Sequence, residues 1–141
     1  MEAFGASPGC DNSAIVFRGD HDWRLGEKLH WRKFSLWEKA TRAPLIIAAP
    51  DVTTENTRSE RTVSFLDLYP TIADLCGVPG RKEFEGHSLR PLLANPKADW
   101  NRPAVTTWGK DNHSIRSERW RYTRDRDGTE ELYDHTSDPL E

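Results

Sequence analysis

The sequence of 141 residues has few cysteines, no long hydrophobic run and no excess of basic side chains. Its two cysteines, Cys10 and Cys76, lie too far apart to form a zinc motif, and two are too few for a disulfide framework. No apolar run approaches the ~20 residues of a membrane helix, so we expect no membrane span. Because 20 Lys and Arg face 23 Asp and Glu, we also expect no nucleic-acid partner.

Apolar side chains are also scarce. Hydrophobic residues make up 35% of the chain and the mean hydropathy is −0.80. Six Trp, five Phe and three Tyr nevertheless argue against disorder. The composition therefore predicts a folded domain with an exposed face, or a piece of a larger one. Residues 1–5 show neither a basic nor an apolar stretch, so we expect no signal peptide there, and the compartment stays open.

The first part of the chain alternates strand and helix patterns. Residues 13–17 and 45–49 are short apolar runs typical of strands buried on both faces. Between them, residues 33–42 have helical spacing, and Pro44 ends this pattern. The order strand, helix, strand predicts a parallel α/β layer.

A second helix is predicted over residues 65–76 by an apolar stripe at helical spacing. Asp67 is expected to cap its start and Gly77 to end it. Cys76 falls on the stripe, so we expect it to be a buried structural residue.

The last third of the chain has the pattern of a small antiparallel sheet. Its strand-like segments are residues 104–108, 114–117, 120–123 and 131–133, and the Asp127-Gly128 pair indicates a hairpin before the last of them. We therefore predict two domains, 1–95 and 96–141. Basic side chains of this part, such as Arg116 and Arg121, would form either a polar, aromatic rim or the solvent face of the sheet, and we expect the solvent face.

Two places carry candidate chemistry. Asp20 and His21 belong to the polar cluster 18–22 that directly follows the first predicted strand, where a carboxylate oxygen and an imidazole nitrogen can face one cation. Residues 23–33 then carry four Lys or Arg against one Glu, which suits an oxyanion. The alternatives are a solvated Asp-His pair and a solvated basic loop whose tryptophans pack on the sheet.

The order of the motifs resembles the later half of the type I sulfatases, most closely the iduronate-2-sulfatase-like branch. The residues that carry the resemblance are GDHDWRLGE at 19–27, WRK at 31–33, APLI at 43–46, SFLDLYPT at 64–71 and GHSLRPLL at 86–93. The segments 114–116 and 131–139 resemble the small C-terminal subdomain of that family. The match runs from about residue 11 to residue 141.

The resemblance implies an α/β fold: part of an alkaline-phosphatase-like sheet with helices, followed by a small antiparallel β subdomain. It implies hydrolysis of sulfate esters, often those of sulfated sugars or other sulfated small molecules. The family's nucleophile is a hydrated formylglycine made from a cysteine, and its cofactor is a divalent metal, usually Ca²⁺.

Site residues follow from the resemblance one by one. Asp20 and His21 are similar to two metal ligands, and Lys33 is similar to a catalytic lysine that contacts a sulfate oxygen. Trp23 and His30 would be substrate-binding. Sulfate-ester cleavage builds charge on oxygens, which a metal and a fixed ammonium stabilise. The predicted helix over residues 33–42 would hold Lys33 firmly near its start.

The chain also departs from the family. It lacks the nucleophile motif Cys-x-Pro-x-Arg and the early pair of aspartates, so the metal site is incomplete and we expect no turnover from this chain alone. The implied partner is the missing N-terminal half of the enzyme. Asp22 stands where the family usually has Gly, which predicts either strain in the turn or weaker sulfate binding.

Two other functions stay open. One is a phosphoryl hydrolase of the same superfamily, because an Asp-His pair at a strand end also suits zinc and phosphate esters. The other is a non-catalytic remnant that binds sulfated glycans through Trp23, Trp31 and the basic loop.

Overall fold

The computed structural model describes residues 8–141, and the expectation of no signal peptide in residues 1–5 lies outside them. Contacts divide the described chain into two compact units. Unit 1 comprises residues 8–18, 45–59 and 65–98, and unit 2 comprises residues 19–44, 60–64 and 99–141. The domain boundary predicted at residue 95 stays a prediction.

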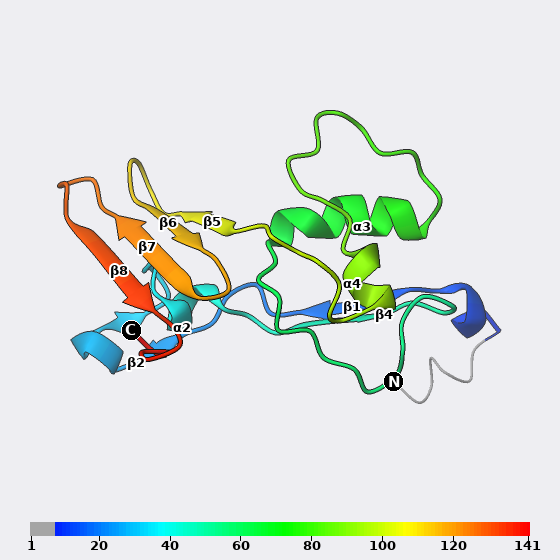
Figure 1. Cartoon of the computed structure of the whole chain (residues 1–141), viewed down its shortest axis with the longest axis horizontal. Helices are drawn as coiled ribbons and strands as arrows, with labels where there is room; N and C mark the ends of the chain where they lie inside the picture. Colours follow the sequence, from blue (N-terminus) through cyan, green and yellow to red (C-terminus); the bar gives the residue numbers. More distant parts are fainter. Residues whose placement is uncertain (1–7) are drawn as a thin grey trace. The chain divides into compact units, whose positions relative to one another are not determined.

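Unit 1 contains the 3₁₀-helix η1 (Cys10–Asn12) and a two-stranded sheet of β1 (Ile15–Arg18) and β4 (Leu45–Ala48) (Figure 1). The two strands pair antiparallel, with Phe17 opposite Ile46. The predicted parallel layer is therefore wrong for this pair, because the chain between the strands supplies no crossover helix longer than four residues. Phe17 is 62% and Ile46 60% exposed, so these strands are not buried on both faces within the chain.

The second predicted helix is confirmed. The 3₁₀-helix η3 (Phe65–Asp67) leads into α3 (Leu68–Leu75), and Gly77 ends the helix with a φ of +67°. Asp67 occupies the cap position, but its carboxylate accepts the backbone N–H of His87 at 2.9 Å instead of capping α3. A polar contact with the loop has replaced the predicted cap.

The buried side of α3 differs from the predicted apolar stripe. Thr71 is fully buried: its hydroxyl donates to the Asp67 carbonyl at 2.5 Å and accepts the Leu89 N–H at 2.8 Å. These bonds fix the start of α4 (Arg90–Ala94) against α3. Ile72 is 44% exposed, and Cys76 is exposed too, so the prediction that Cys76 is buried is wrong for this chain.

Unit 2 holds the predicted antiparallel sheet. Its four strands lie side by side in chain order: β5 (Ala104–Thr107), β6 (His113–Arg116), β7 (Trp120–Arg124) and β8 (Glu130–Asp134) (Figure 1). The predicted hairpin is confirmed, since Gly128 adopts a φ of +89° and its N–H donates to the Asp125 carbonyl at 2.9 Å. The remaining elements of unit 2 are short: β2 (Arg24–Leu25), η2 (Glu27–Leu29), β3 (Trp31–Arg32) and α2 (Glu38–Thr41).

The two faces of this sheet differ in chemistry. One face carries a row of apolar side chains in register across all four strands, and each is at least 36% exposed: Val105, Ile115, Tyr122 and Leu132. The other face is polar but buried, and Ser114, Arg121 and Thr123 are each 2% exposed. The prediction that Arg121 lies on the solvent face is therefore wrong.

The helices of residues 8–141 are all short. None combines the length and the apolar content that crossing a membrane requires.

Candidate functional site

The loop after β1 is fixed by backbone hydrogen bonds to residues 40–44. The Gly19 N–H donates to the Pro44 carbonyl at 3.0 Å, and the Asp22 N–H donates to the Ala40 carbonyl at 3.3 Å. A Cβ at position 19 would lie 3.2 Å from the Pro44 ring, so this close approach favours glycine. The loop therefore presents Asp20 and His21 from a defined backbone.

Asp20, His21 and Lys33 converge on one point. The His21 Nε2 lies 3.5 Å from an Asp20 carboxylate oxygen and 3.0 Å from the Lys33 ammonium. The other ring nitrogen, Nδ1, lies 2.8 Å from the Asp22 carbonyl, which can only accept a hydrogen bond. Nδ1 therefore donates to that carbonyl, and Nε2 is the ring nitrogen that faces Lys33 and Asp20.

The charges of this cluster stabilise the ionised carboxylate. The backbone N–H of Asp20 and the neighbouring His21 and Lys33 hold the pKa of Asp20 below its usual value. The Asp20 side chain is 77% exposed and that of His21 is 31% exposed. The cluster is thus an open one, accessible to a ligand from solvent.

Trp23 lies beside the cluster. Its ring centroid is 6.2 Å from that of His21, and 48% of its surface is exposed. The backbone φ of Asp22 is not positive. The strained turn predicted for a residue that replaces the family's usual glycine is therefore absent. Its carboxylate instead accepts the Trp23 N–H at 2.8 Å.

Lys33 is not held by a helix. The predicted helix over residues 33–42 is wrong for its first half, since α2 begins only at Glu38 and Lys33 directly follows β3. A turn in which the Ser35 N–H donates to the Lys33 carbonyl at 2.9 Å takes the place of the helix. Phe34 contacts Trp108 with a ring separation of 6.3 Å, and this tertiary contact competes with the helical periodicity.

His30 lies apart from the cluster. Its ring packs edge-on against Trp37 at 6.0 Å and lines a cavity of about 570 Å³ in unit 2. We call this cavity the aromatic–acidic pocket, because aromatic and acidic side chains also line it: Phe34, Trp37, Trp108, Asp125, Asp127 and Glu131. His30 was predicted to bind substrate. The pocket itself could not be predicted, because the residues that line it come from distant segments of the chain.

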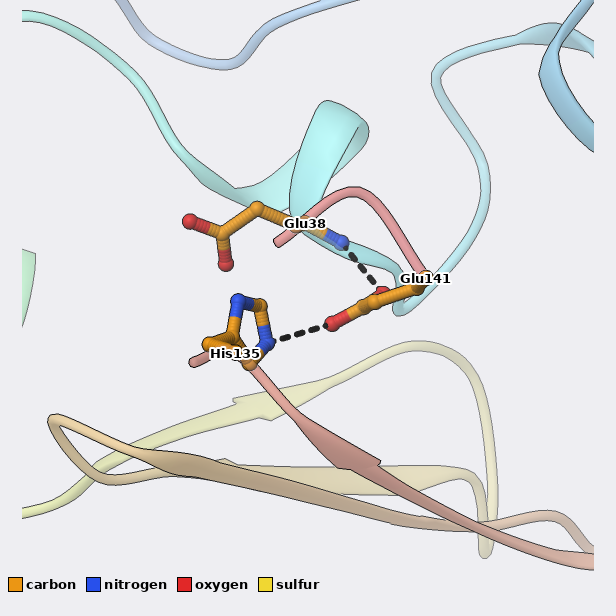
Figure 2. Close-up of side chains that lie close together, drawn as sticks. All are labelled: Glu38, His135 and Glu141. Carbon is orange, nitrogen blue, oxygen red and sulfur yellow. Dashed lines mark hydrogen bonds and ion pairs between the residues drawn. The ribbon is translucent and has the colours of Figure 1, made fainter. Parts of the chain in front are cut away.

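A second cluster in unit 2 consists of Glu38, His135 and Glu141, whose ligand atoms all lie within 4.8 Å of one another (Figure 2). Glu141 accepts the Glu38 N–H at 2.8 Å and lies 2.9 Å from the His135 Nε2. Three such residues are a possible metal site by composition.

Arginine supplies the positive charge of this cluster. Arg121 contacts Glu38 and Glu141 at 2.5 Å each, and Arg116 contacts Glu38 at 3.3 Å. Burial acts to raise the pKa of Glu38, but the hydrogen bond from Arg121 and the two arginine charges outweigh it and lower the pKa overall. The cluster is therefore a self-sufficient buried ion-pair network, and we assign it a structural role.

Asp20 and His21 fit a divalent metal better. A carboxylate oxygen and an imidazole lone pair 3.5 Å apart can share one cation, and the Nδ1 hydrogen bond to the Asp22 carbonyl is the support typical of a ligating histidine. In this structure the Lys33 ammonium lies 3.0 Å from the same ring nitrogen, where a metal ion would bind. Two ligands do not complete a Ca²⁺ shell of six to eight oxygens, so the pair fits as one side of such a site.

The chain matches a known protein family over most of its length. Residues 26–141 match the family described as N-sulphoglucosamine sulphohydrolase, C-terminal. The folds of solved neighbours are sulfatase folds of the alkaline-phosphatase-like type. The chain belongs to the sulfatase family, of which it represents a C-terminal portion, as the resemblance predicted.

Named relatives agree. A sulfatase of Formosa agariphila is 38% identical over the whole chain, which spans 28% of that protein. A Delta 4,5-hexuronate-2-O-sulfatase of Bacteroides thetaiotaomicron is 29% identical, also over the whole chain, which spans 32% of it. The chain thus spans about a third or less of the relatives that it matches, and the iduronate-2-sulfatase-like branch stays a prediction.

Solved structures show the same fold. An enzyme in complex with its substrate D-glucosamine-2-N,6-O-disulfate superimposes with a TM-score of 0.85 at 28% identity, covering 94% of this chain and 29% of that one. The phosphonate monoester hydrolase of Silicibacter pomeroyi gives a TM-score of 0.80 at 26% identity, covering 90% and 29%.

Proposed function

We propose that this chain supplies the sulfate-binding lysine and two metal ligands of a sulfatase that hydrolyses sulfate esters of sugars. The observation that carries the proposal is that Asp20 and Lys33 lie 3.5 Å and 3.0 Å from the His21 Nε2, in a chain that belongs to the sulfatase family. The formylglycine nucleophile and the remaining metal ligands would come from the N-terminal half of the enzyme, outside this chain.

The roles of the three residues follow from their chemistry. Asp20 and His21 would hold the metal, which we propose is Ca²⁺ and which when bound would polarise the sulfate oxygens. The Lys33 ammonium would break its contact with the His21 Nε2 and donate a hydrogen bond to a nonbridging sulfate oxygen. A fixed positive charge at that oxygen stabilises the negative charge that develops as the ester bond breaks.

Sulfated sugars are the proposed substrates. The Formosa and Bacteroides relatives are sulfatases, and one of them is named for a sulfated hexuronate. The solved neighbour binds a disulfated glucosamine. Trp23, exposed beside His21, offers an aromatic face of the kind that packs on a sugar ring.

The proposal is tested by grafting. Residues 8–141 replace the matching segment of the Formosa agariphila sulfatase, and hydrolysis of an aryl sulfate is measured. We expect an active chimera in which Lys33→Ala lowers kcat/KM by about 10²–10³-fold, the usual loss for one donor to a developing charge. The matched control, Lys39→Ala on α2, removes the same charge away from the cluster and should retain activity. A chimera that folds but is inactive, or in which both variants behave alike, would refute the proposal.

A phosphoryl hydrolase is the second candidate. The likeness to a phosphonate monoester hydrolase at 26% identity favours it, because the same cluster can bind a phosphoryl oxygen. The chimera is therefore also assayed with an aryl phosphonate ester, and its metal content is measured. Calcium with a preference for the sulfate ester supports the sulfatase, whereas zinc with a preference for the phosphonate supports the alternative.

A further inference from the structure

The aromatic–acidic pocket has the size and walls of a small-molecule site. Its volume of about 570 Å³ lies within the usual range for small-molecule pockets. Phe34 and Trp108 lie 6.3 Å apart with their rings tilted by 35°, and Trp37 forms another aromatic wall. The Trp37 ring already has Arg24 at 4.2 Å and Lys28 at 4.9 Å from its centre. The faces of Phe34 and Trp108 are therefore the ones that suit the apolar side of a sugar ring or a positively charged group.

Three carboxylates share this pocket. Glu131 is fixed by the indole N–H of Trp37, which donates to it at 2.6 Å, and Asp127 accepts the Thr129 N–H at 2.9 Å. Burial, and after it the charges of Asp127 and Glu131, raise the pKa of Asp125. Among the described residues that line the pocket, the basic side chains are His30 and the exposed Arg126, and Arg24 and Lys28 pack on the Trp37 ring from outside the lining. The described lining therefore has a surplus of negative charge.

Two further polar atoms of the lining lack partners. The His30 Nε2 and the Ser35 Oγ are buried and have no hydrogen-bond partner among residues 8–141. Buried polar atoms of folded proteins almost always have one, so these two atoms point to a group that the described residues do not supply.

We infer that the aromatic–acidic pocket binds the protonated amine of an amino sugar. This inference rests on the proposed function, of which it specifies the substrate: a sulfated glucosamine whose amine is free, in contrast to the N-sulfated glucosamine that the solved neighbour binds. The ammonium would lie between Asp125 and Glu131 against the indole face of Trp108, where ion pairing and cation–π attraction add. An N-acetyl group removes that positive charge, and an N-sulfo group replaces it by a negative one, so the same carboxylates disfavour both.

The position of the pocket relative to Lys33 supports its use in the same reaction. Phe34 lines the pocket, and the Lys33 ammonium lies 5.6 Å from the centre of the Phe34 ring. A sugar held against Phe34 can thus present a sulfate oxygen to Lys33 and an amine to the acidic wall.

The test measures binding to the 141-residue chain by NMR, with the indole N–H signals of Trp37 and Trp108 as reporters. The probes are methyl glucosaminide, its N-acetyl form and its N-sulfo form, at about pH 6, where the amine is protonated. We expect the amine to bind about tenfold tighter than the N-acetyl form, as one ion pair of about 1.4 kcal/mol provides, and the N-sulfo form to bind most weakly.

Variants locate the effect. Asp125→Asn should lower the affinity for the amine to that of the N-acetyl form, whereas Glu130→Gln, a loss of the same charge from a neighbouring residue outside the lining, should leave it unchanged. The inference is overturned if the three probes bind alike, if none binds, or if the two variants have the same effect. None of these results depends on hydrolysis by the chimera, and Lys33→Ala there does not touch the acidic wall, so the two proposals fail separately.

Discussion

At the scale of single residues, burial has changed the role of Arg121. Its side chain is 3% exposed and contacts the carboxylates of Glu38 and Glu141, which are themselves 10% and 0% exposed. The same guanidinium donates to the Leu36 carbonyl at 2.9 Å. One arginine thus ties the segment before α2 and residue 141 to the buried face of the sheet.

Removing this arginine should be strongly destabilising. Arg121→Ala removes the cation that Glu38 and Glu141 share and leaves them with Arg116 at 3.3 Å and His135 at 2.9 Å, and we expect the free energy of unfolding to fall by about 3 kcal/mol. The measurement is urea denaturation of the 141-residue chain followed by circular dichroism.

Arg119→Ala is the matched control, since Arg119 pairs with Asp134 at 2.7 Å but is 56% exposed. Solvent screens an exposed pair, so this variant should unfold at nearly the same urea concentration as the wild type. Equal losses in the two variants would show that the buried network has no special role in stability.

At the scale of elements, Gly86 fixes the loop before α4 against η3. A Cβ at this position would lie 2.0 Å from the Leu66 carbonyl oxygen and 2.7 Å from the Asp67 nitrogen. Both neighbours are backbone atoms, which cannot rotate away. Glycine is required here for close approach and not for its backbone angle, because its φ is not positive.

The variant Gly86→Ala should therefore separate the loop from η3. We expect the free energy of unfolding to fall by about 1–3 kcal/mol, the usual cost of overpacking against atoms that must shift. Gly80→Ala in the same loop meets no atom within 4 Å and should change stability by less than about 0.5 kcal/mol. Urea titrations of both variants measure the free energy of unfolding. A Gly86→Ala variant as stable as the wild type would contradict the close approach of the loop to η3.

At the scale of the whole molecule, apolar surface is left uncovered in both units. Phe17 and Ile46 are exposed on the strand pair of unit 1, and Val105 and Leu132 are exposed on the sheet of unit 2. The chain spans 28% of the Formosa relative, and we expect the rest of such an enzyme to cover part of this surface.

Ile46→Ser tests this expectation. Because Ile46 is 60% exposed, the change should cost about 1 kcal/mol or less in the 141-residue chain. It should nevertheless lower the yield of complex when the chain is co-expressed with the preceding part of the Formosa sulfatase and co-purified. Val78→Ser, at a 55% exposed loop position, is the control and should leave the yield unchanged. A normal yield with Ile46→Ser would show that this strand face stays uncovered.

Much of the candidate site could be predicted because it lies within a short stretch of sequence. Asp20, His21 and Lys33 are at most thirteen residues apart, and the structure brings their side chains together. The support of Lys33 was predicted wrongly, since aromatic contacts of Phe34 replaced the expected helix. The aromatic–acidic pocket could not be predicted, because Trp108 and Glu131 meet Phe34 only after long loops have closed.

The sequence by itself determined the family, the four antiparallel strands, the hairpin at Gly128 and helix α3, because motif order, alternation and turn residues are local properties of the chain. Only the tertiary structure decided that β1 and β4 run antiparallel and that Thr71 and Arg121 are buried while Ile72 and Cys76 are exposed. Strand direction and burial depend on which distant segments pack together, and the energy of that packing outweighs the preferences of any single segment.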